Sequence, residues 1–191
     1  FDIETIPQRG ALSDIQQEEL AKRVNSKVSS GMDYSEARKL IMGTTAQFGE
    51  IVCISWHIYS ARMGTETQGS FIGDEAQILE DFWNKIRSFM GVFVGFNHLH
   101  FDVPWIIHRS MKHKIPPSNK NFLQTRKYQS FPHYDVKQKL ADWSWDKSIS
   151  LNLACDFFGL PTPKDGPVSA KTIADAFAHG RIDEIAEYCE K

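Results

Sequence analysis

The order in which strand-like and helix-like stretches follow one another constrains the fold of this chain most strongly. Two strand-like runs, residues 1–6 and the β-branched and aromatic run at 51–59, come first. Apolar residues with helical spacing follow over 73–90, then a short apolar run over 92–96 and a second helical stretch over 102–113. Strands that come first and then alternate with helices predict an α/β protein with a mixed sheet.

Shorter signals mark the other elements. A capping-box pattern at Ser13 and Gln16 predicts a helix start, and Gly159 and Gly180 predict helix ends. The run at 92–96 is of the kind that is buried on both faces of a sheet. Further elements are expected as helices over 35–42, 149–158, 169–178 and from 182 to the chain end, and as strands ending near Phe71 and covering 133–136. We expect a single domain over residues 1–191, with a helical insertion at 8–48 and with both ends trimmed from a longer chain.

Composition excludes several classes of protein. With 41% hydrophobic and 24% charged residues among 191, the chain is globular rather than disordered. Its formal net charge of −2 provides no global argument for nucleic-acid binding. No apolar run approaches the ~20 residues of a membrane span. The three cysteines form no CxxC motif, which argues against a disulfide framework or zinc site and is typical of a cytoplasmic protein.

Two acids stand in the first strand-like run, FDIETI. Asp2 and Glu4 are two residues apart, so they point to the same side of a strand. Two like charges at that spacing repel each other, and their burial is costly unless a positive group pairs with them. Hard cations such as Mg²⁺ and Mn²⁺ prefer carboxylate oxygens. The pattern is thus consistent with a metal site, and also with a solvated strand end that carries two incidental acids.

A third acid follows the apolar run at 92–96, in the segment GFNHLHFD. Asp102 begins a predicted helix, where an Asp has a plain structural role as a cap or as a charge near the positive helix end. It also lies beyond the carboxyl end of a strand, where open α/β sheets build their sites. Carboxylates from two strand ends could together surround one or two metal ions, an arrangement that serves phosphodiester hydrolysis.

These motifs together resemble those of a known family. FDIET and GFNxxxFD resemble the first two motifs of the DEDD superfamily of 3′–5′ exonucleases. The segments FDIET, FGEIVCIS, GFNHLHFD, HYD, SLNLACDFFGLP and GRIDEIAEYCEK resemble, in order and spacing, predicted 3′–5′ exonucleases related to the proofreading domain of family B DNA polymerases. The resemblance implies a ribonuclease-H-like α/β fold, with a mixed central β-sheet of about five strands flanked by α-helices.

The resemblance also implies the roles of site residues. Asp2, Glu4 and Asp102 would bind two Mg²⁺ or Mn²⁺ ions, and Glu4 would help to orient the attacking water. The third family motif, Tyr-x-x-x-Asp, has Tyr188 as its tyrosine and places a fourth carboxylate at position 192, just past Lys191. Tyr188 would contact the nucleophilic water; the alternative is an ordinary, partly buried helix aromatic.

Five more residues are candidates for contact with the substrate or for support of the site. The backbone at Thr5 and Ile6 corresponds to the place where the family meets the 3′-terminal nucleotide. Asn97 either positions that nucleotide or holds the loop that presents the third acid, and Phe101 either stacks on a base or packs internally. Asp135, in the HYD segment, is expected to support the site structurally rather than to bind a metal.

Local charge provides a separate argument for nucleic acid. Residues 103–134 contain no acid but six Lys or Arg with interleaved aromatics, which could follow a phosphate backbone and stack on bases: Arg109, Lys112, Lys114, Lys120, Arg126, Lys127, Trp105, Phe122 and Tyr128. The alternative is a solvated helix face followed by a loop. Trp143 and Trp145 either line a groove or pack internally, and Lys164 either reaches phosphate or sits in a turn.

The sequence therefore predicts a metal-dependent 3′–5′ exonuclease. It would act on the 3′ ends of single-stranded nucleic acid, DNA in preference to RNA, and release nucleoside monophosphates by a two-metal mechanism. No membrane contact is expected. The alternative is a non-catalytic nucleic-acid-binding or scaffolding domain with the same fold, because fold alone does not determine function.

Overall fold

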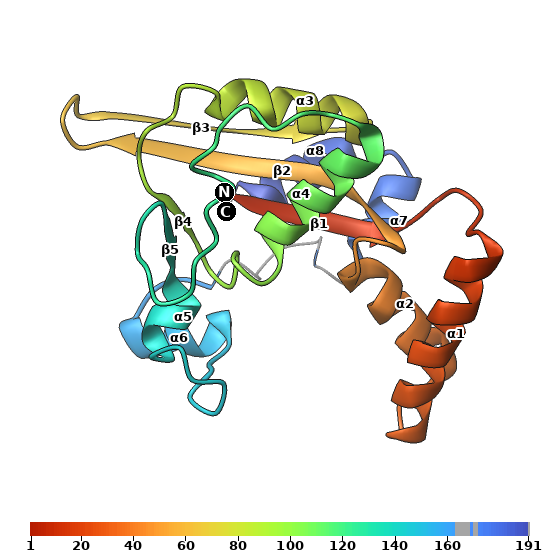
Figure 1. Cartoon of the computed structure of the whole chain (residues 1–191). Helices are drawn as coiled ribbons and strands as arrows, with labels where there is room; N and C mark the ends of the chain where they lie inside the picture. The colour runs from red at the N-terminus through yellow and green to blue at the C-terminus, as the bar shows by residue number, and fades with distance from the viewer. Residues whose placement is uncertain (163–168, 170–171, 191) are drawn as a thin grey trace.

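The computed structural model describes residues 1–162, 169 and 172–190, and five strands in this part form two sheets (Figure 1). An antiparallel sheet in the order β1-β2-β3 consists of β1 (Asp2–Pro7), β2 (Gly49–Ser60) and β3 (Thr65–Ile72). A parallel pair consists of β4 (Phe93–Gly95) and β5 (His133–Asp135). The α/β class is confirmed, whereas the prediction of one mixed central sheet of about five strands is wrong.

The two sheets separate at the open edge of β1. The Phe1 nitrogen donates to the Val94 carbonyl oxygen at 3.4 Å, so β4 lies beside this edge. Two residues further along β1, the backbone N–H of Ile3 donates to Oδ1 of Asp102 at 2.9 Å and not to a carbonyl oxygen of β4. A carboxylate has taken the donor that a ladder between β1 and β4 would need, so no continuous sheet forms there.

Helices occupy most of the remaining chain. Their bounds are α1 (Asp14–Ser29), α2 (Tyr34–Thr44), α3 (Glu75–Ile86), α4 (Asp102–His113), α5 (Val136–Leu140), α6 (Leu151–Phe158), α7 (Ile173–Ala178) and α8 (Ile182–Cys189). The capping box between Ser13 and Gln16 is confirmed, with both of its hydrogen bonds formed. Gly159 (φ 65°) and Gly180 (φ 69°) adopt the left-handed conformation beyond α6 and α7, as their type predicts. The short α5 has no counterpart among the predicted elements, and Lys164 lies outside the described residues.

Both faces of β1 are covered. Ile3 packs into a core cluster with residues of α3 and α4, whereas Ile6 packs with residues of α7 and α8. Residues three apart in a strand point to opposite faces of the sheet. Ile3 and Ile6 therefore belong to two separate core clusters, one on each face of β1. Figure 1 shows α3 and α4 on one side of the sheet and α8 on the other. Asp2 and Glu4 share the face of Ile6, which is the face toward α8.

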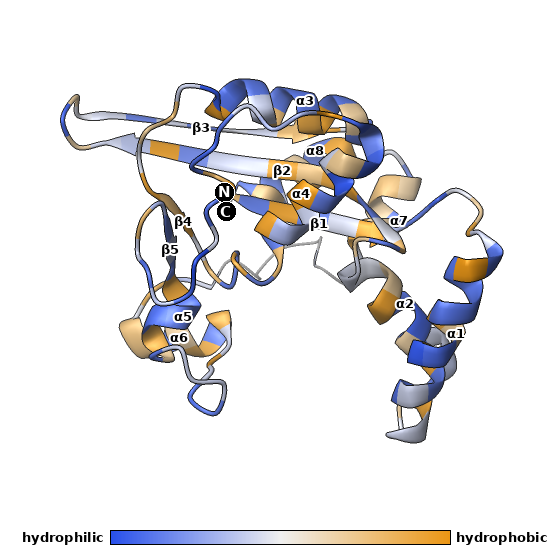
Figure 2. Cartoon of the chain, viewed as in Figure 1, coloured by the Kyte–Doolittle hydropathy of each residue, from blue (hydrophilic) through white to orange (hydrophobic). Residues whose placement is uncertain are grey.

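Two peripheral regions complete the fold. α1 and α2 pack against each other around a small cluster that includes Leu20 and Ile41, and polar residues cover much of α1 (Figure 2). β4 is not buried on both faces, because Val92 and Val94 are 43% and 50% exposed, so that prediction is wrong. Within the described residues β4 pairs only with β5, at the rim of the molecule. The described helices include none that could span a bilayer.

Candidate active site

The carboxyl groups of Asp2 and Asp102 lie close enough to affect each other's protonation where β1 meets α4. Asp102 is buried, and its Oδ1 also accepts the hydrogen bond from the Ile3 N–H. Asp2 is exposed to solvent and lines a pocket of about 270 Å³, together with Gly95 and Cys189. Acids that are 100 residues apart in the chain therefore meet, and Asp2 alone of the two lines the open pocket.

Asp102 does not serve as the N-terminal cap of α4. The N-cap of α4 is Phe101, and no side chain caps the helix. Asp102 is the first helical residue, and its carboxylate accepts the hydrogen bond from β1 instead. The structural role that its position in the sequence suggests is thus not the one it has, although its charge still lies near the positive end of the helix.

All three acids hold protons more tightly than usual. Burial raises the pKa of Asp102 well above its ordinary value, and the negative charge of Asp2 raises it further. Protein atoms crowd the Asp2 carboxyl at the pocket wall, although part of its surface reaches solvent, and this burial raises the pKa of Asp2. Burial, followed by the charges of Asp2 and Asp102, raises the pKa of Glu4 to about 8. Like charges this close favour a neutral state or a bound cation.

The donor set suits a hard cation. Within the described chain no Lys, Arg or His forms an ion pair with Asp2, Glu4 or Asp102. The same part of the chain has no group of three His, Cys, Asp or Glu side chains arranged to hold one ion. Mg²⁺ commonly takes only one or two protein carboxylates and completes its shell with water and substrate phosphate. The contacting pair meets that requirement, with Glu4 beside it.

The last turn of α8 lies next to the acids. Tyr188 is half-buried and packs against the cluster around Ile6. A hydrogen bond to Cys53, burial and the nearby charges of Glu4 and Asp2 raise the pKa of the Cys189 thiol. The structure therefore places the predicted tyrosine on the same face of β1 as the acids. Its packing agrees equally with the alternative of a helix aromatic.

Asp135 fixes the loop that carries Asp102. Its two carboxylate oxygens accept hydrogen bonds from the backbone N–H groups of Asn97 (2.9 Å) and Leu99 (3.0 Å). The Asn97 carbonyl oxygen in turn accepts from the N–H of Phe101 at 3.1 Å. Asn97 has a left-handed backbone (φ 69°), which these bonds support. The contacts of Asp135 are those of a structural support for the loop between β4 and α4.

The other predicted substrate residues lie away from the pocket beside Asp2. The Thr5 hydroxyl donates to the Gly43 carbonyl oxygen, and Ile6 is buried. Phe101 packs against Trp105, with 5.8 Å between the ring centroids. Pairing shifts register between Glu4 and Thr5, because β2 has an extra residue there. Such bulges re-aim side chains and are frequent next to active sites.

Several residues of this pocket could not be predicted from the sequence. Ser55 pairs with Asp2 across the ladder between β1 and β2, and this register brings neighbouring residues of β2 and β3 to the site. The unforeseen lining residues are Ser55, Trp56, His57, Gln68, Cys189 and Glu190. No motif marks them, because only the strand register and the packing of α8 place them beside Asp2.

Part of the predicted basic surface is internal. Arg109 is 2% exposed, and its Nε donates to Glu75 at 2.7 Å while its Nη1 donates to the Ala46 carbonyl oxygen at 3.0 Å. Trp105 and Phe122 are also buried. Their prediction as nucleic-acid contacts is wrong, because Glu75 of α3 neutralises the arginine inside the core. Lys120, Arg126, Lys127 and Tyr128 remain exposed.

Comparison with known proteins identifies one match. A family model described as a predicted 3′–5′ exonuclease related to the exonuclease domain of PolB matches residues 45–191, which is more than half of the chain. The matched segment contains Asn97, Asp102, Asp135 and Tyr188, whereas the strand that carries Asp2 precedes it. Neither a curated protein nor a solved structure matches the chain.

Proposed function

The chain belongs to the family of predicted 3′–5′ exonucleases related to the exonuclease domain of PolB, and on that premise we propose that it removes nucleotides from the 3′ end of single-stranded nucleic acid with the help of divalent cations. The observation that carries the proposal is the contact between the carboxyl groups of Asp2 and Asp102. Asp2 lines a pocket, and no basic side chain of the described residues pairs with either acid.

The acids have distinct roles in this proposal. Asp2 and Asp102 hold Mg²⁺ or Mn²⁺, and Glu4 completes the set for two ions when substrate phosphate is present. The bound ions supply two effects: a lower pKa of the attacking water and stabilisation of the leaving 3′ oxygen. Glu4, whose pKa is about 8 without a cation, is an ionised carboxylate beside bound ions and orients the water.

Tyr188 and Asp135 support the reaction from the protein side. Tyr188 lies on the face of β1 that carries the acids, from which its hydroxyl orients the nucleophilic water. Asp135 holds the backbone of Asn97, and so holds the loop that delivers Asp102. The pattern of the family places a fourth carboxylate at position 192.

The substrate is a single strand in this proposal. The pocket beside Asp2, about 270 Å³, is near the lower end of the volumes of small-molecule sites, which suits one terminal nucleotide. The resemblance assigns the backbone of Thr5 and Ile6 to contact with the terminal nucleotide outside this pocket, while Asn97 and Phe101 belong to the loop that carries Asp102. DNA is preferred to RNA on the resemblance alone, and nucleoside monophosphates are the products.

The test uses the full-length protein and 3′-labelled single strands of DNA and RNA. Shortening is followed in Mg²⁺, in Mn²⁺ and in EDTA, for the wild type, Asp2→Asn and Asp102→Asn. Asp14→Asn, at an exposed carboxylate of α1, is the matched control. Shortening that needs a cation and both site acids supports the proposal. Binding without shortening of either substrate supports the non-catalytic alternative, as does a residue at position 192 that cannot bind a cation.

A further inference from the structure

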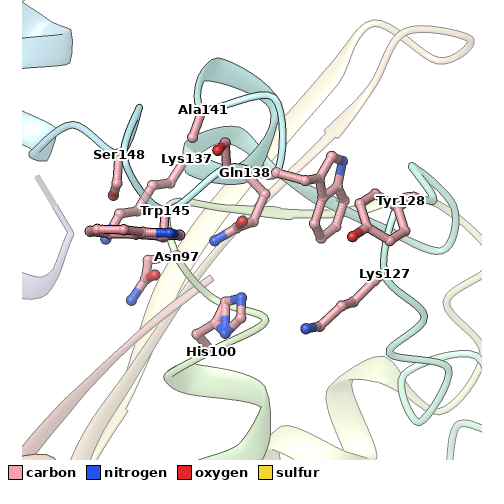
Figure 3. A pocket seen from close by; sticks show the side chains of 11 residues that line it. Asn97, His100, Lys127, Tyr128, Lys137, Gln138, Ala141, Trp145 and Ser148 are labelled. Carbon is pink, nitrogen blue, oxygen red and sulfur yellow. The ribbon is translucent and has the colours of Figure 1, made fainter.

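A second pocket, of about 440 Å³, lies between the loop that follows β4 and the segments on either side of β5 and α5 (Figure 3). Asn97 and His100 line it from the loop that ends at Asp102, Lys127 and Tyr128 from the segment before β5, and Trp145 from the segment after α5. It shares no lining residue with the pocket beside Asp2. A cavity of this volume is large enough for a nucleotide.

Large aromatic rings line this second pocket but are not covered. Trp145 is 89% exposed and Tyr128 is 73% exposed. In Figure 3 the Trp145 ring stands on one side of the pocket and Tyr128 on the other, with Gln138 between them. The Tyr128 and Trp143 rings contact each other, with their centroids 5.3 Å apart. Exposed rings of this size around a cavity provide faces on which a flat, aromatic ligand can stack.

The charge of the second pocket is positive. Lys127 and Lys137 line it, and no acid is among the described residues that do so. The nearby Asp142 lies 3.9 Å from Lys147, which partly neutralises it. Lys139 lies over the Trp143 ring at 5.9 Å and adds a further positive charge. The aromatic faces and the two lysines together suit a ligand with both a planar base and a phosphate.

Residues with unusual backbone conformations also lie around the second pocket. Asn97, Tyr128 and Trp143 have φ values of 69°, 65° and 60°, in the left-handed region that residues other than glycine seldom adopt. For a bulky residue such as Trp143 this conformation is a clear outlier. Outliers of this kind concentrate where ligands bind, because the surrounding structure must hold them. Here Asp135 provides that support for Asn97.

We propose that the second pocket binds an internal nucleotide of the same strand whose 3′ end reacts at Asp2 and Asp102. The base stacks on Trp145, and Lys127 and Lys137 balance the phosphate charge. The loop from Asn97 to Asp102 joins the two places, since it lines this pocket and then carries the buried acid. The inference rests on the proposed function for the identity of the strand. It requires a single strand, because a paired base cannot lie on an exposed ring.

Binding of oligonucleotides to the full-length protein in EDTA tests the inference without catalysis. Fluorescence anisotropy compares 5′-labelled single strands of three and eight nucleotides, as DNA and as RNA. Trp145→Ala should weaken binding of the eight-nucleotide strand roughly tenfold or more, with a smaller loss for three nucleotides. Trp145→Phe, which keeps a ring, should restore most of the affinity. Tyr59→Ala, at a 68% exposed aromatic of β2, is the matched control.

The lysine is tested by salt dependence. Lys127→Gln should reduce the slope of log affinity against log salt by about 0.7, the value for one phosphate contact of a single strand. Lys39→Gln, at an exposed lysine of α2, should leave the slope unchanged. An unchanged slope for Lys127→Gln would remove the phosphate from the proposal and overturn it.

The outcomes separate this inference from the proposed function. Binding that depends on Trp145 without any cleavage supports the pocket and contradicts the exonuclease. Cleavage by the wild type, with the same affinity in Trp145→Ala and in the control, supports the exonuclease and overturns the pocket. Failure of the wild type to bind either oligonucleotide also overturns the pocket.

Discussion

Replacement of Asp102 by Asn should stabilise the cation-free protein. The Asn side chain keeps an oxygen to accept the Ile3 N–H and gains an amide that can donate to Asp2. It also removes a buried acid that must either carry a charge beside Asp2 or hold a proton that the unfolded chain releases. Two unit charges about 4 Å apart repel by about 4 kcal/mol at an effective dielectric constant of 20. Because Asp2 is exposed, screening reduces this to roughly 1–2 kcal/mol. For a chain of this size the corresponding rise in Tm is about 2–8 °C.

The size of this stabilisation also depends on pH. The pKa of Asp102 is raised in the folded state, so the unfolded chain releases this proton first and folding is disfavoured as pH rises above the ordinary value of 3.8. The advantage of Asp102→Asn should therefore grow from pH 5 to pH 8. Added Mg²⁺ or Mn²⁺ should raise the Tm of the wild type and not that of the variant. Thermal unfolding in EDTA and in each cation measures both effects. A variant that is less stable than the wild type in EDTA at pH 8, or that gains as much from the cation, would refute the reasoning.

Three further predictions concern the framework of the site. Arg109→Met leaves Glu75 buried without its main partner and should cost about 3–5 kcal/mol in urea unfolding. Gly49→Ala should cost about 1–3 kcal/mol or prevent folding, because its Cβ would lie 2.4 and 2.7 Å from two backbone carbonyl oxygens. Burial lowers the pKa of His98 to about 4 from an ordinary 6.5, so the unfolded chain binds this proton first. The contribution of His98 to the unfolding free energy, measured as the difference between the wild type and His98→Asn, should therefore fall by up to about 3 kcal/mol as pH drops from 6.5 to 4.

A control measurement tests each of these three predictions. Lys112→Met, on the same helix as Arg109 but exposed, should cost far less, and equal losses would count against the buried pair. Gly43→Ala, where no atom lies within 4 Å of the new Cβ, should be nearly neutral. A comparable loss at both glycines would contradict the steric argument. For His98, a difference between the wild type and His98→Asn that stays constant from pH 6.5 to 4 would show that the imidazole is not held neutral.

Local chemistry made the helix boundaries predictable from the sequence. The Ser13 and Gln16 side chains satisfy backbone donors within one turn, and Gly159 can adopt a positive φ at no steric cost. Neither signal depends on the rest of the fold. The same applies to the shared face of Asp2 and Glu4, which follows from the period of a strand.

The features that could not be predicted from the sequence depend on contacts between residues far apart in the chain. Arg109 belongs to a basic run with no nearby acid in the sequence, yet Glu75 of α3 pairs with it inside the core. At the edge of β1 where the two sheets separate, the Ile3 N–H donates to the carboxylate of Asp102, which lies 99 residues away in the chain. Residue type and spacing carry no information on such partners until the chain is folded.

The most direct test of the central claim is the rate of 3′-terminal nucleotide release by the full-length protein as Mg²⁺ is titrated. The contact between Asp2 and Asp102 predicts a rate that saturates with Mg²⁺ and is abolished by EDTA. It also predicts a fall of roughly 100-fold or more in both Asp2→Asn and Asp102→Asn, with Asp14→Asn unaffected. Release at the wild-type rate in either site variant, or release that continues in EDTA, would contradict the assignment of this carboxylate pair as the catalytic cation site.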